Sequence, residues 1–355
     1  MKISTARLSN RALGVIAAAV TLPAVALSGV ASADPSGTPT YRKLVGVGSD
    51  TTEEVMNGMA EAITISGTKV LGSYNAVGGQ FDSRDPAALP AGATSCTYTA
   101  DDAGQAAGAG VRPNGSGNGR SRLLESLTSG NSHLGCLDFG RSSSLSLGAA
   151  STQLTYIPFA LDAVAYGVRK DSTISRGLSL ASLKAIYQCT AGANFIPLLP
   201  QSGSGTRNFF LAQLGLSDAT IGSCVRDTWT DPADNTVKSI QEHDGRVLLD
   251  KKEIVPFSVS QYAAQSAGAA TDKRGVAVLG NVNGVSSFAA NTAAAFTREV
   301  YNVIPTARVG DTANYPELNS VFVGSNSLIC QQKAVIGKYG MGTVADCGDV
   351  SQHTP

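Results

Sequence analysis

The sequence predicts an α/β protein with two lobes, and three observations lead to this prediction. The chain has 355 residues, which is more than a single hydrophobic core usually organises. Short apolar runs typical of strands alternate with amphipathic runs typical of helices, and this alternation indicates an α/β fold. The run at 154–168 is long, apolar and rich in β-forming residues, so we expect a strand that crosses between the lobes.

The first 33 residues have the pattern of a secretory signal peptide. Three basic residues precede an apolar run at 13–27, and Ala31-Ser32-Ala33 supplies the small residues of a cleavage site. A membrane anchor is the alternative, but the apolar run is short for a span and contains Pro23. We therefore expect cleavage after Ala33 and a secreted, extracytoplasmic protein. No Cys follows the apolar run, so no lipid-attachment Cys is expected.

Composition excludes several classes of function. Without residues 1–33 the chain keeps 24 basic and 27 acidic residues, a net charge of −3, and it has no basic run that would bind nucleic acid. An even number of Cys in an exported protein indicates disulfides, for which fifteen pairings exist. The simplest pairing follows sequence order and joins Cys96 to Cys136, Cys189 to Cys224 and Cys330 to Cys347. No C-x-x-C pair occurs, so neither a zinc site nor another cofactor is expected.

The N-terminal elements can be placed in order. Residues 43–47 predict a strand, and a helix follows, with Ser49 or Asp50 as its N-cap and Glu53 completing a capping box. The stretch 78–119 is rich in Gly, Ala, Pro and Ser, which predicts a long surface loop pinned by its Cys. The end of that loop turns into a second helix, which reaches Leu127.

The later elements follow the same alternation. Residues 137–144 predict the end of a strand and a polar loop. Beyond the crossing strand we expect a helix at 180–187, a strand at 195–199, a helix at 207–214, a strand at 254–260, a return strand at 298–304 and a helical region at 314–340. The expected division is 34–158 for the first part of lobe 1, 159–297 for lobe 2, and 298–355 for the return to lobe 1.

One arrangement occurs three times: a Gly- and Ser-rich turn leads directly into a helix. It is found at 46–51, 114–119 and 202–207. The first turn of a helix has unpaired backbone N–H groups and a partial positive charge, and Gly lets a ligand approach that backbone closely. Such turns bind phosphate, sulfate or carboxylate groups. A single turn of this kind is also common in loops, but three of them favour a site for an oxyanion.

These segments resemble, in order, the blocks of the phosphate-binding proteins of ABC importers, which have a type II periplasmic-binding-protein fold. The resemblance rests on Gly46-Val-Gly-Ser-Asp-Thr, Gly115-Ser-Gly, Asp138-Phe-Gly-Arg-Ser-Ser, the run at 157–166 and Gly203-Ser-Gly-Thr-Arg. It covers most of the chain after Ala33 and is loosest at 64–113 and after 220. It implies two α/β lobes, joined by crossing strands, that close on an oxyanion.

The resemblance also implies which residues contact the ligand. Carried over by position, the contacts are Ser49, Asp50, Thr51, Ser116, Ser142, Ser143, Ser204, Gly205 and Thr206. Three positions depart from the family pattern. Asp50 replaces a Thr, Ser143 replaces the Asp that accepts the proton of hydrogen phosphate, and Pro200 replaces an Arg that pairs with the anion.

Two compensations for these departures are open. Asp50 either takes over the acceptor role lost at Ser143 or is only a helix N-cap. The missing guanidinium is replaced by Arg141, Arg120 or Arg207, or these arginines face solvent. We expect Arg141, in the loop on the side of the cleft, to be the ligand contact. Arg207 is expected to point outward from the first turn of its helix.

The function expected from these features is a non-enzymatic solute-binding protein that captures phosphate or a related oxyanion. An ABC permease is its natural partner, and a monomer is expected. The alternative is a secreted structural or interaction protein that keeps the fold but has lost the anion site. A hydrolase is disfavoured, because His133, His243 and His353 lie in no catalytic motif. A polar stretch with Asp231, Asp234, Glu242 and Asp244 around Trp229 is interpreted as a solvated loop.

Overall fold

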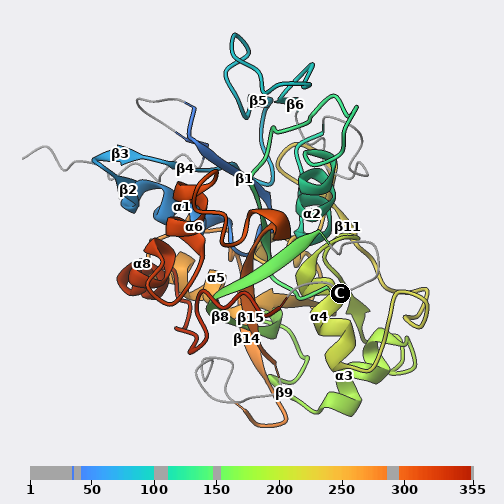
Figure 1. Ribbon diagram of the computed structural model, residues 1–355. Helices are drawn as coiled ribbons and strands as arrows, with labels where there is room; N and C mark the ends of the chain where they lie inside the picture. Colours follow the sequence, from blue (N-terminus) through green and yellow to red (C-terminus); the bar gives the residue numbers. More distant parts are fainter. Residues whose placement is uncertain (1–33, 36–40, 100–110, 147–152, 286–295, 353–355) are drawn as a thin grey trace, which may run out of the picture.

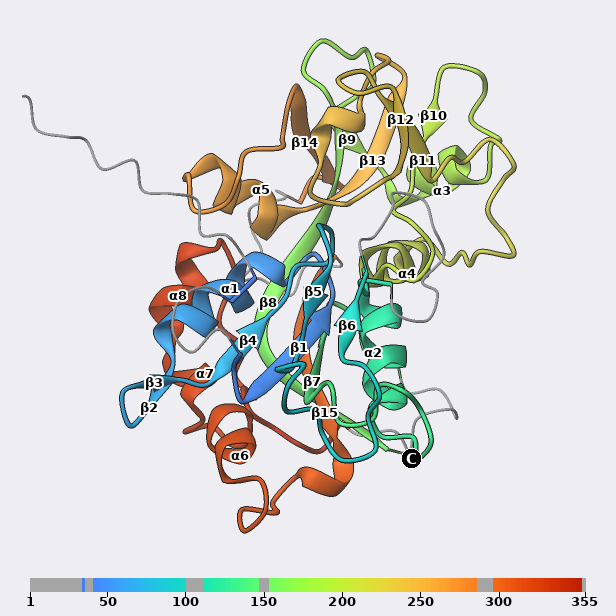
Figure 2. The same ribbon diagram turned by 90° about the horizontal axis from the view of Figure 1, so that it is seen from above.

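The computed structural model describes residues 34–35, 41–99, 111–146, 153–285 and 296–352 (Figure 1). The expected signal peptide and part of the loop at 78–119 lie outside the described residues. Within these ranges, nine strands form one mixed sheet with helices packed around it. Seven of them follow the order β10-β13-β8-β15-β7-β1-β4, and β14 pairs with both β8 and β9. Figure 2 shows that the elements gather into two lobes, with β8 running from one to the other.

Lobe 1 is built on the parallel strands β4, β1 and β7. Its elements before the crossing are β1 (Leu44–Gly48), α1 (Glu53–Ala62), β2 (Thr64–Ile65), β3 (Thr68–Lys69), β4 (Leu71–Ser73), β5 (Phe81–Asp82), β6 (Thr97–Tyr98), α2 (Ser116–Glu125) and β7 (Phe139–Ser142). The chain returns to this lobe with α6 (Pro316–Phe322), α7 (Leu328–Gln331) and α8 (Lys333–Lys338). The predicted helical region at 314–340 is therefore three short helices.

Lobe 2 lies between the two crossings and is built on β13 and β14, which pair antiparallel with β8. Its elements are β9 (Gly177–Leu178), α3 (Leu180–Tyr187), β10 (Ile196–Pro197), α4 (Gly205–Gln213), β11 (Thr228–Asp231), β12 (Thr236–Ser239), β13 (Glu253–Ser258), α5 (Val259–Ser266) and β14 (Ala277–Val282). Helix α5 packs against lobe 1. Its residue Ala264 belongs to the same hydrophobic core as residues of α1, α6 and α8.

Two antiparallel strands connect the lobes, namely β8 (Leu154–Arg169) and β15 (Thr297–Pro305). Strand β8 is buried along almost its whole length, as its continuous apolar sequence requires. Pro158 has no backbone N–H to donate, and the pairing register shifts opposite it, between Val300 and Tyr301. Farther along the pair, Arg298 and Asp162 lie directly opposite each other. The crossing strand predicted at 154–168 and the return strand predicted at 298–304 are confirmed.

The start of α1 differs from the sequence-based expectation. The helix begins at Glu53 with Thr52 in the N-cap position, and Thr52 makes no side-chain cap. The predicted cap at Ser49 or Asp50 is wrong, because these residues lie in the turn before the helix. The predicted capping box is also wrong, since the Glu53 carboxylate accepts a hydrogen bond from the Ala76 N–H at 2.6 Å instead.

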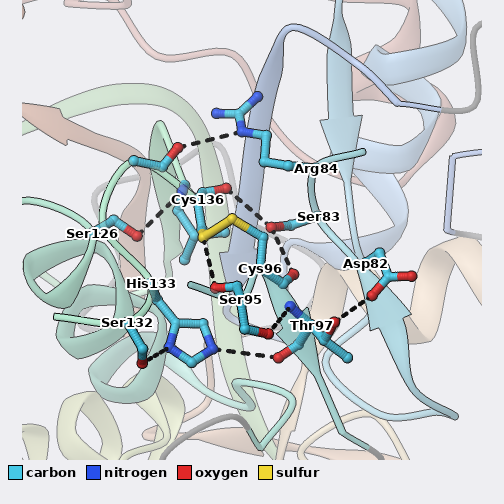
Figure 3. Close-up of a disulfide and its surroundings, with 12 residues drawn as sticks. Asp82, Ser83, Arg84, Ser95, Cys96, Thr97, Ser126, Ser132, His133 and Cys136 are labelled. Atoms are coloured by element: carbon cyan, nitrogen blue, oxygen red, sulfur yellow. Dashed lines mark hydrogen bonds between the residues drawn. A yellow bond between two sulfur atoms is a disulfide. The ribbon is translucent and has the colours of Figure 1, made fainter. Parts of the chain in front are cut away.

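Three disulfides join the six Cys in sequence order: Cys96–Cys136, Cys189–Cys224 and Cys330–Cys347. Figure 3 shows the first of them, where the Ser83 hydroxyl lies 3.1 Å from the carbonyl oxygens of Cys96 and of Cys136. His133 is also buried here and contacts Ser132 and the carbonyl of Thr97, so it supports the loop rather than a site. None of the helices in the described ranges has the length and apolar character needed to span a bilayer.

Candidate functional site

Five hydroxyl side chains from four separate segments meet at the boundary between the lobes. We call them the hydroxyl cluster: Thr51, Ser116, Ser143, Ser204 and Thr206. All five are buried. Oγ1 of Thr51 lies 3.2 Å from Oγ1 of Thr206 and 3.3 Å from Oγ of Ser143. Oγ of Ser116 lies 3.3 Å from Oγ of Ser143, so the cluster is continuous across the two lobes.

Strand ends and helix N-termini position the hydroxyls of the cluster. Thr51 follows β1, and Ser143 follows β7, which is the parallel neighbour of β1. The carboxyl ends of parallel strands meet at one edge of a sheet, where ligands commonly bind. Ser116 is the first residue of α2 and Ser204 is the N-cap of α4. Two of the three Gly/Ser turns therefore place a helix N-terminus at this edge.

The N-terminus of α4 contacts lobe 1 very closely. The Ser204 hydroxyl accepts the backbone N–H groups of Thr206 and Arg207, which caps the helix. A Cβ atom at Gly205 would lie 2.4 Å from Oγ of Ser116 and 2.5 Å from Oγ of Ser143, so a side chain here would require these hydroxyls or the lobes to move. The carbonyl of the preceding Gly203 accepts the N–H of Gly117 from α2 at 3.0 Å. The two lobes are thus in direct contact.

A carboxylate that the sequence did not reveal lies on the hydroxyl cluster. Glu242 accepts hydrogen bonds from the Thr51 hydroxyl and, at 3.3 Å, from the Ser204 hydroxyl. Its exposed fraction is 0%, so its interpretation as part of a solvated loop is wrong. Asp231 and Asp244 are buried as well, whereas Asp234 is exposed. Burial, followed by the charge of Asp50, raises the pKa of Glu242 to about 7.

A guanidinium also reaches the cluster, from the crossing strand β15. Nη2 of Arg298 donates to Oγ1 of Thr206 at 2.7 Å and to Oδ2 of Asp162 at 2.8 Å. Asp162 further accepts hydrogen bonds from Ser258 and Ser260. Nη1 of Arg298 is buried and has no hydrogen-bond partner among the described residues. A buried donor without a partner is costly, and this makes Nη1 a candidate contact for an anionic ligand.

Beside the cluster, Asp50 faces His243 across the lobe boundary. Oδ2 of Asp50 lies 3.4 Å from Nδ1 of His243, and within the described residues neither atom makes a hydrogen bond. Burial raises the pKa of Asp50, although its hydrogen bond with Glu242 acts in the opposite direction, and burial lowers the pKa of His243. They line a cavity of about 10 Å³ together with Glu53, Glu54, Gln261, Gln265, Thr271 and Lys273. That volume matches a single water molecule.

The other sequence-predicted contacts lie next to the cluster rather than in it. The guanidinium of Arg141 donates to the carbonyls of Ser49, Gly48 and Tyr74 and to the Ser73 hydroxyl, so each of its three nitrogens is bonded within lobe 1. Arg298 and not Arg141 is the guanidinium that reaches the cluster. Ser142 donates to the carbonyl of Ser144. Oγ of Ser49 is buried and without a hydrogen-bond partner among the described residues.

The remaining candidate arginines also lie elsewhere. Arg207 is buried rather than pointing outward, and it forms ion pairs with Asp218 and Asp227 away from the cluster. Arg120 donates to the Tyr156 hydroxyl. In the described part of the chain no group of three or more His, Cys, Asp or Glu could hold a metal ion. A larger cavity of about 640 Å³ lies at the far end of lobe 1, between Leu127, Leu134, Pro305 and Tyr315, and none of the cluster residues lines it.

Comparisons with known proteins support the fold. No family model and no curated protein matches the sequence. Among solved structures, a chain from Clostridium perfringens assigned as a phosphate ABC transporter substrate-binding protein, with bound phosphate, is 15% identical with a TM-score of 0.53. The match covers 85% of this chain and 99% of that one.

Two further solved structures have a TM-score of 0.49. One is an ABC-type phosphate transport receptor from Vibrio cholerae, which is 13% identical, with 85% of this chain and 100% of that one covered. The other is a phosphate-binding protein from Stenotrophomonas maltophilia, which is 12% identical, with 86% of this chain and 91% of that one covered. At these identities the similarity concerns the fold and not the ligand. The sheet topology and the match to the Clostridium perfringens chain show an α/β fold with two lobes, as the sequence predicts.

Proposed function

We propose that this protein is a secreted solute-binding protein that captures phosphate or a related oxyanion at the hydroxyl cluster. The observation that carries the proposal is the convergence of buried donors from both lobes on one point. Hydroxyls, the N-terminus of α4 and a guanidinium can together bind an oxyanion without a net positive charge. Closure of the lobes around a hinge assembles this set of donors.

The unpaired polar atoms at the lobe boundary support this proposal. Oγ of Ser49, Oδ2 of Asp50 and Nη1 of Arg298 are buried without hydrogen-bond partners in the described ranges. Folded proteins satisfy most buried polar atoms, and those left over often mark a bound ligand or water. Arg298 supplies the guanidinium that is missing at Pro200. Ser49, Asp50, Gly205 and Ser142 remain proposed contacts, because they lie beside the cluster.

The natural partner of such a protein is an ABC permease, which would receive the oxyanion after the lobes open. The proposed role is binding without a covalent step, in line with the solved structure from Clostridium perfringens, which is assigned as a substrate-binding protein.

Calorimetric titration of the purified protein with phosphate, arsenate, sulfate and molybdate, near pH 5.5, tests the proposal. We expect heat and a higher thermal midpoint with at least one of them. Ser204→Ala and Thr206→Ala should each weaken binding about tenfold, because each removes one hydrogen bond to a charged ligand. Ser202→Ala, in the exposed part of the same turn, is the matched control and should bind normally. Absence of heat with every oxyanion would refute the proposal.

One observation favours a second function, in which the fold is kept and no anion is bound. The Glu242 carboxylate already accepts hydrogen bonds from two hydroxyls of the cluster. A protein that has lost its solute could use this carboxylate to fix the closed form as a rigid interaction module. The same titration separates the two functions, because a rigid module gives no heat with any of the four oxyanions.

A further inference from the structure

Glu242 lies where the polar hydrogens of the cluster converge. Oγ1 of Thr51 has three oxygen neighbours but only one proton to donate. An ionised carboxylate can only accept, so the Thr51 proton is directed to Glu242. The Thr206 hydroxyl then donates to Thr51 and accepts from Nη2 of Arg298. The result is a continuous chain of hydrogen bonds that runs from the guanidinium to the carboxylate.

The same donors are those that a solute oxyanion would use. The Ser204 hydroxyl at the start of α4 donates to Oε2 of Glu242, and Thr51 donates to Oε1. The carboxylate of Glu242 therefore holds the position of an anionic ligand within the cluster. A second anion in the same buried place would compete for these hydroxyls and would be repelled strongly, because water does not screen the charges there.

The charges around Glu242 do not offset a second anion. Arg298 faces it but is paired with Asp162 at 2.8 Å. Asp50 faces it from lobe 1 and adds another acidic group. His243, the next residue in the chain, is driven toward its neutral form by burial. Farther from Glu242, the groups that act on Asp50 and His243 are Arg141, Lys273, Glu53 and Asp244.

We propose that the Glu242 carboxylate is an internal ligand of the hydroxyl cluster, and that a solute oxyanion enters only when this carboxylate takes up a proton. The proposal rests on the oxyanion-binding function proposed above and adds the regulation of that site. Protonated Glu242 carries no charge and can donate its O–H to an oxygen of the incoming anion. Burial and the nearby Asp50 place the pKa of Glu242 at about 7. The replacement of the carboxylate by a solute oxyanion should therefore occur at a pH that binding experiments can reach.

Titration with inorganic phosphate across pH, in the unmodified protein and in Glu242→Gln, tests this proposal. Above about pH 7 we expect the affinity of the unmodified protein to fall about tenfold per pH unit, as for one linked proton. Phosphate itself titrates in this range, but equally for both proteins, so their difference isolates Glu242. Near pH 8.5 the Glu242→Gln protein should bind phosphate at least tenfold more tightly than the unmodified protein.

The matched control is Glu253→Gln. Glu253 is another buried carboxylate of lobe 2 with a raised pKa, but it accepts from the Asp250 N–H, away from the cluster. Its variant should follow the unmodified protein at every pH. Equal affinities of the Glu242→Gln and unmodified proteins at every pH would overturn the internal ligand while leaving the oxyanion function standing. Failure of both proteins to bind phosphate, arsenate, sulfate or molybdate at any pH would overturn both proposals.

An infrared measurement on the unmodified protein gives a second test that does not depend on a variant folding. Addition of saturating phosphate near pH 8.5 should produce the C=O stretching band of a newly protonated carboxyl group. The band should increase with phosphate occupancy. Phosphate binding without this band would mean that the oxyanion enters beside an ionised Glu242, which contradicts the proposal.

Discussion

Arg298 and Asp162 carry opposite charges on two strands that are largely buried. Their side chains are 3% and 0% exposed, and they pair directly across β15 and β8. Two charges buried at this depth are tolerated only when each is paired and hydrogen-bonded. Asp162 meets this requirement with Ser258 and Ser260 in addition to the arginine. The pair thus holds the guanidinium in place beside Thr206.

Removal of one member of the Arg298–Asp162 pair should therefore lower the free energy of unfolding. We expect Arg298→Met to lower the free energy of unfolding by about 3 kcal/mol, because Asp162 is left buried and unpaired. Addition of Asp162→Asn should recover part of this loss. Urea denaturation of the two variants measures both values. Arg169→Met is the control, since Arg169 pairs with an exposed Asp171 and should matter little. A similar loss in both Arg variants would contradict this account.

The residue scale also shows what the sequence could and could not predict. The Gly and Ser turns predicted the segments 46–51, 114–119 and 202–207, because the chemistry of a helix N-terminus is local in the chain, and the family resemblance implied Thr51, Ser116, Ser204 and Thr206 within them. Glu242 was missed, because its partners are 38 and 191 residues away and no motif surrounds it. The sequence did contain a sign of the ion pair between Arg298 and Asp162. Asp162 lies within a predicted apolar strand and Arg298 in the predicted return strand, and a charge buried in a strand needs a partner of opposite sign.

At the scale of elements, the contact between α4 and lobe 1 decides how closely the lobes approach. Gly205 begins the helix and has no side chain to separate it from the hydroxyls of Ser116 and Ser143. The sequence predicted this helix to start at Arg207, and the structure starts it at Gly205, with Ser204 as its cap. The Gly-rich turn therefore includes the first turn of the helix and is not only a loop before it.

Gly205→Ala should act as a wedge at this contact. The added methyl group would lie 2.4 Å from Oγ of Ser116 and 2.5 Å from Oγ of Ser143, and we expect the lobes to move apart to accept it because both hydroxyls are already held in the cluster. We expect a larger radius of gyration by small-angle X-ray scattering and at least tenfold weaker oxyanion binding. Gly337→Ala, in helix α8 with open space around its Cβ, is the control and should be neutral or slightly stabilising. An unchanged radius with Gly205→Ala would show that the contact yields locally.

At the scale of the whole molecule, buried carboxyl groups gather in the boundary region. Burial raises the pKa of Asp50 and Glu53, and it raises the pKa of Glu54 and Glu242 to about 7. Fold class and crossing strands were predictable, because they depend on apolar patterns along the chain. This accumulation of acids was not, since it arises only when 50–54 and 242–244 are brought together by the closure of lobe 2 on lobe 1.

These shifts predict how stability depends on pH. Carboxyl groups whose pKa is raised by folding bind more protons in the folded state, so stability is lost as pH rises through the folded pKa. His243 acts in the opposite direction, but only below the pKa of an unfolded imidazole, about 6.5. We therefore expect the thermal midpoint to fall between about pH 6.5 and 8, and to fall less in Glu54→Gln. A midpoint that rises over this interval would contradict the shifts.

The insertion of lobe 2 between β8 and β15 has a consequence for the order of folding. Strand β7 pairs with β1 on one side and with β15 on the other, and β15 is separated from β7 by all of lobe 2. During synthesis β7 therefore waits as an open sheet edge until about residue 305 has emerged, and such an edge is prone to aggregation. Lobe 2 can complete its own core first, and the Cys330–Cys347 bond requires that residue 347 has emerged. The return strand therefore closes the sheet of lobe 1 only after all of lobe 2 has been made, and α6, α7 and α8 follow it.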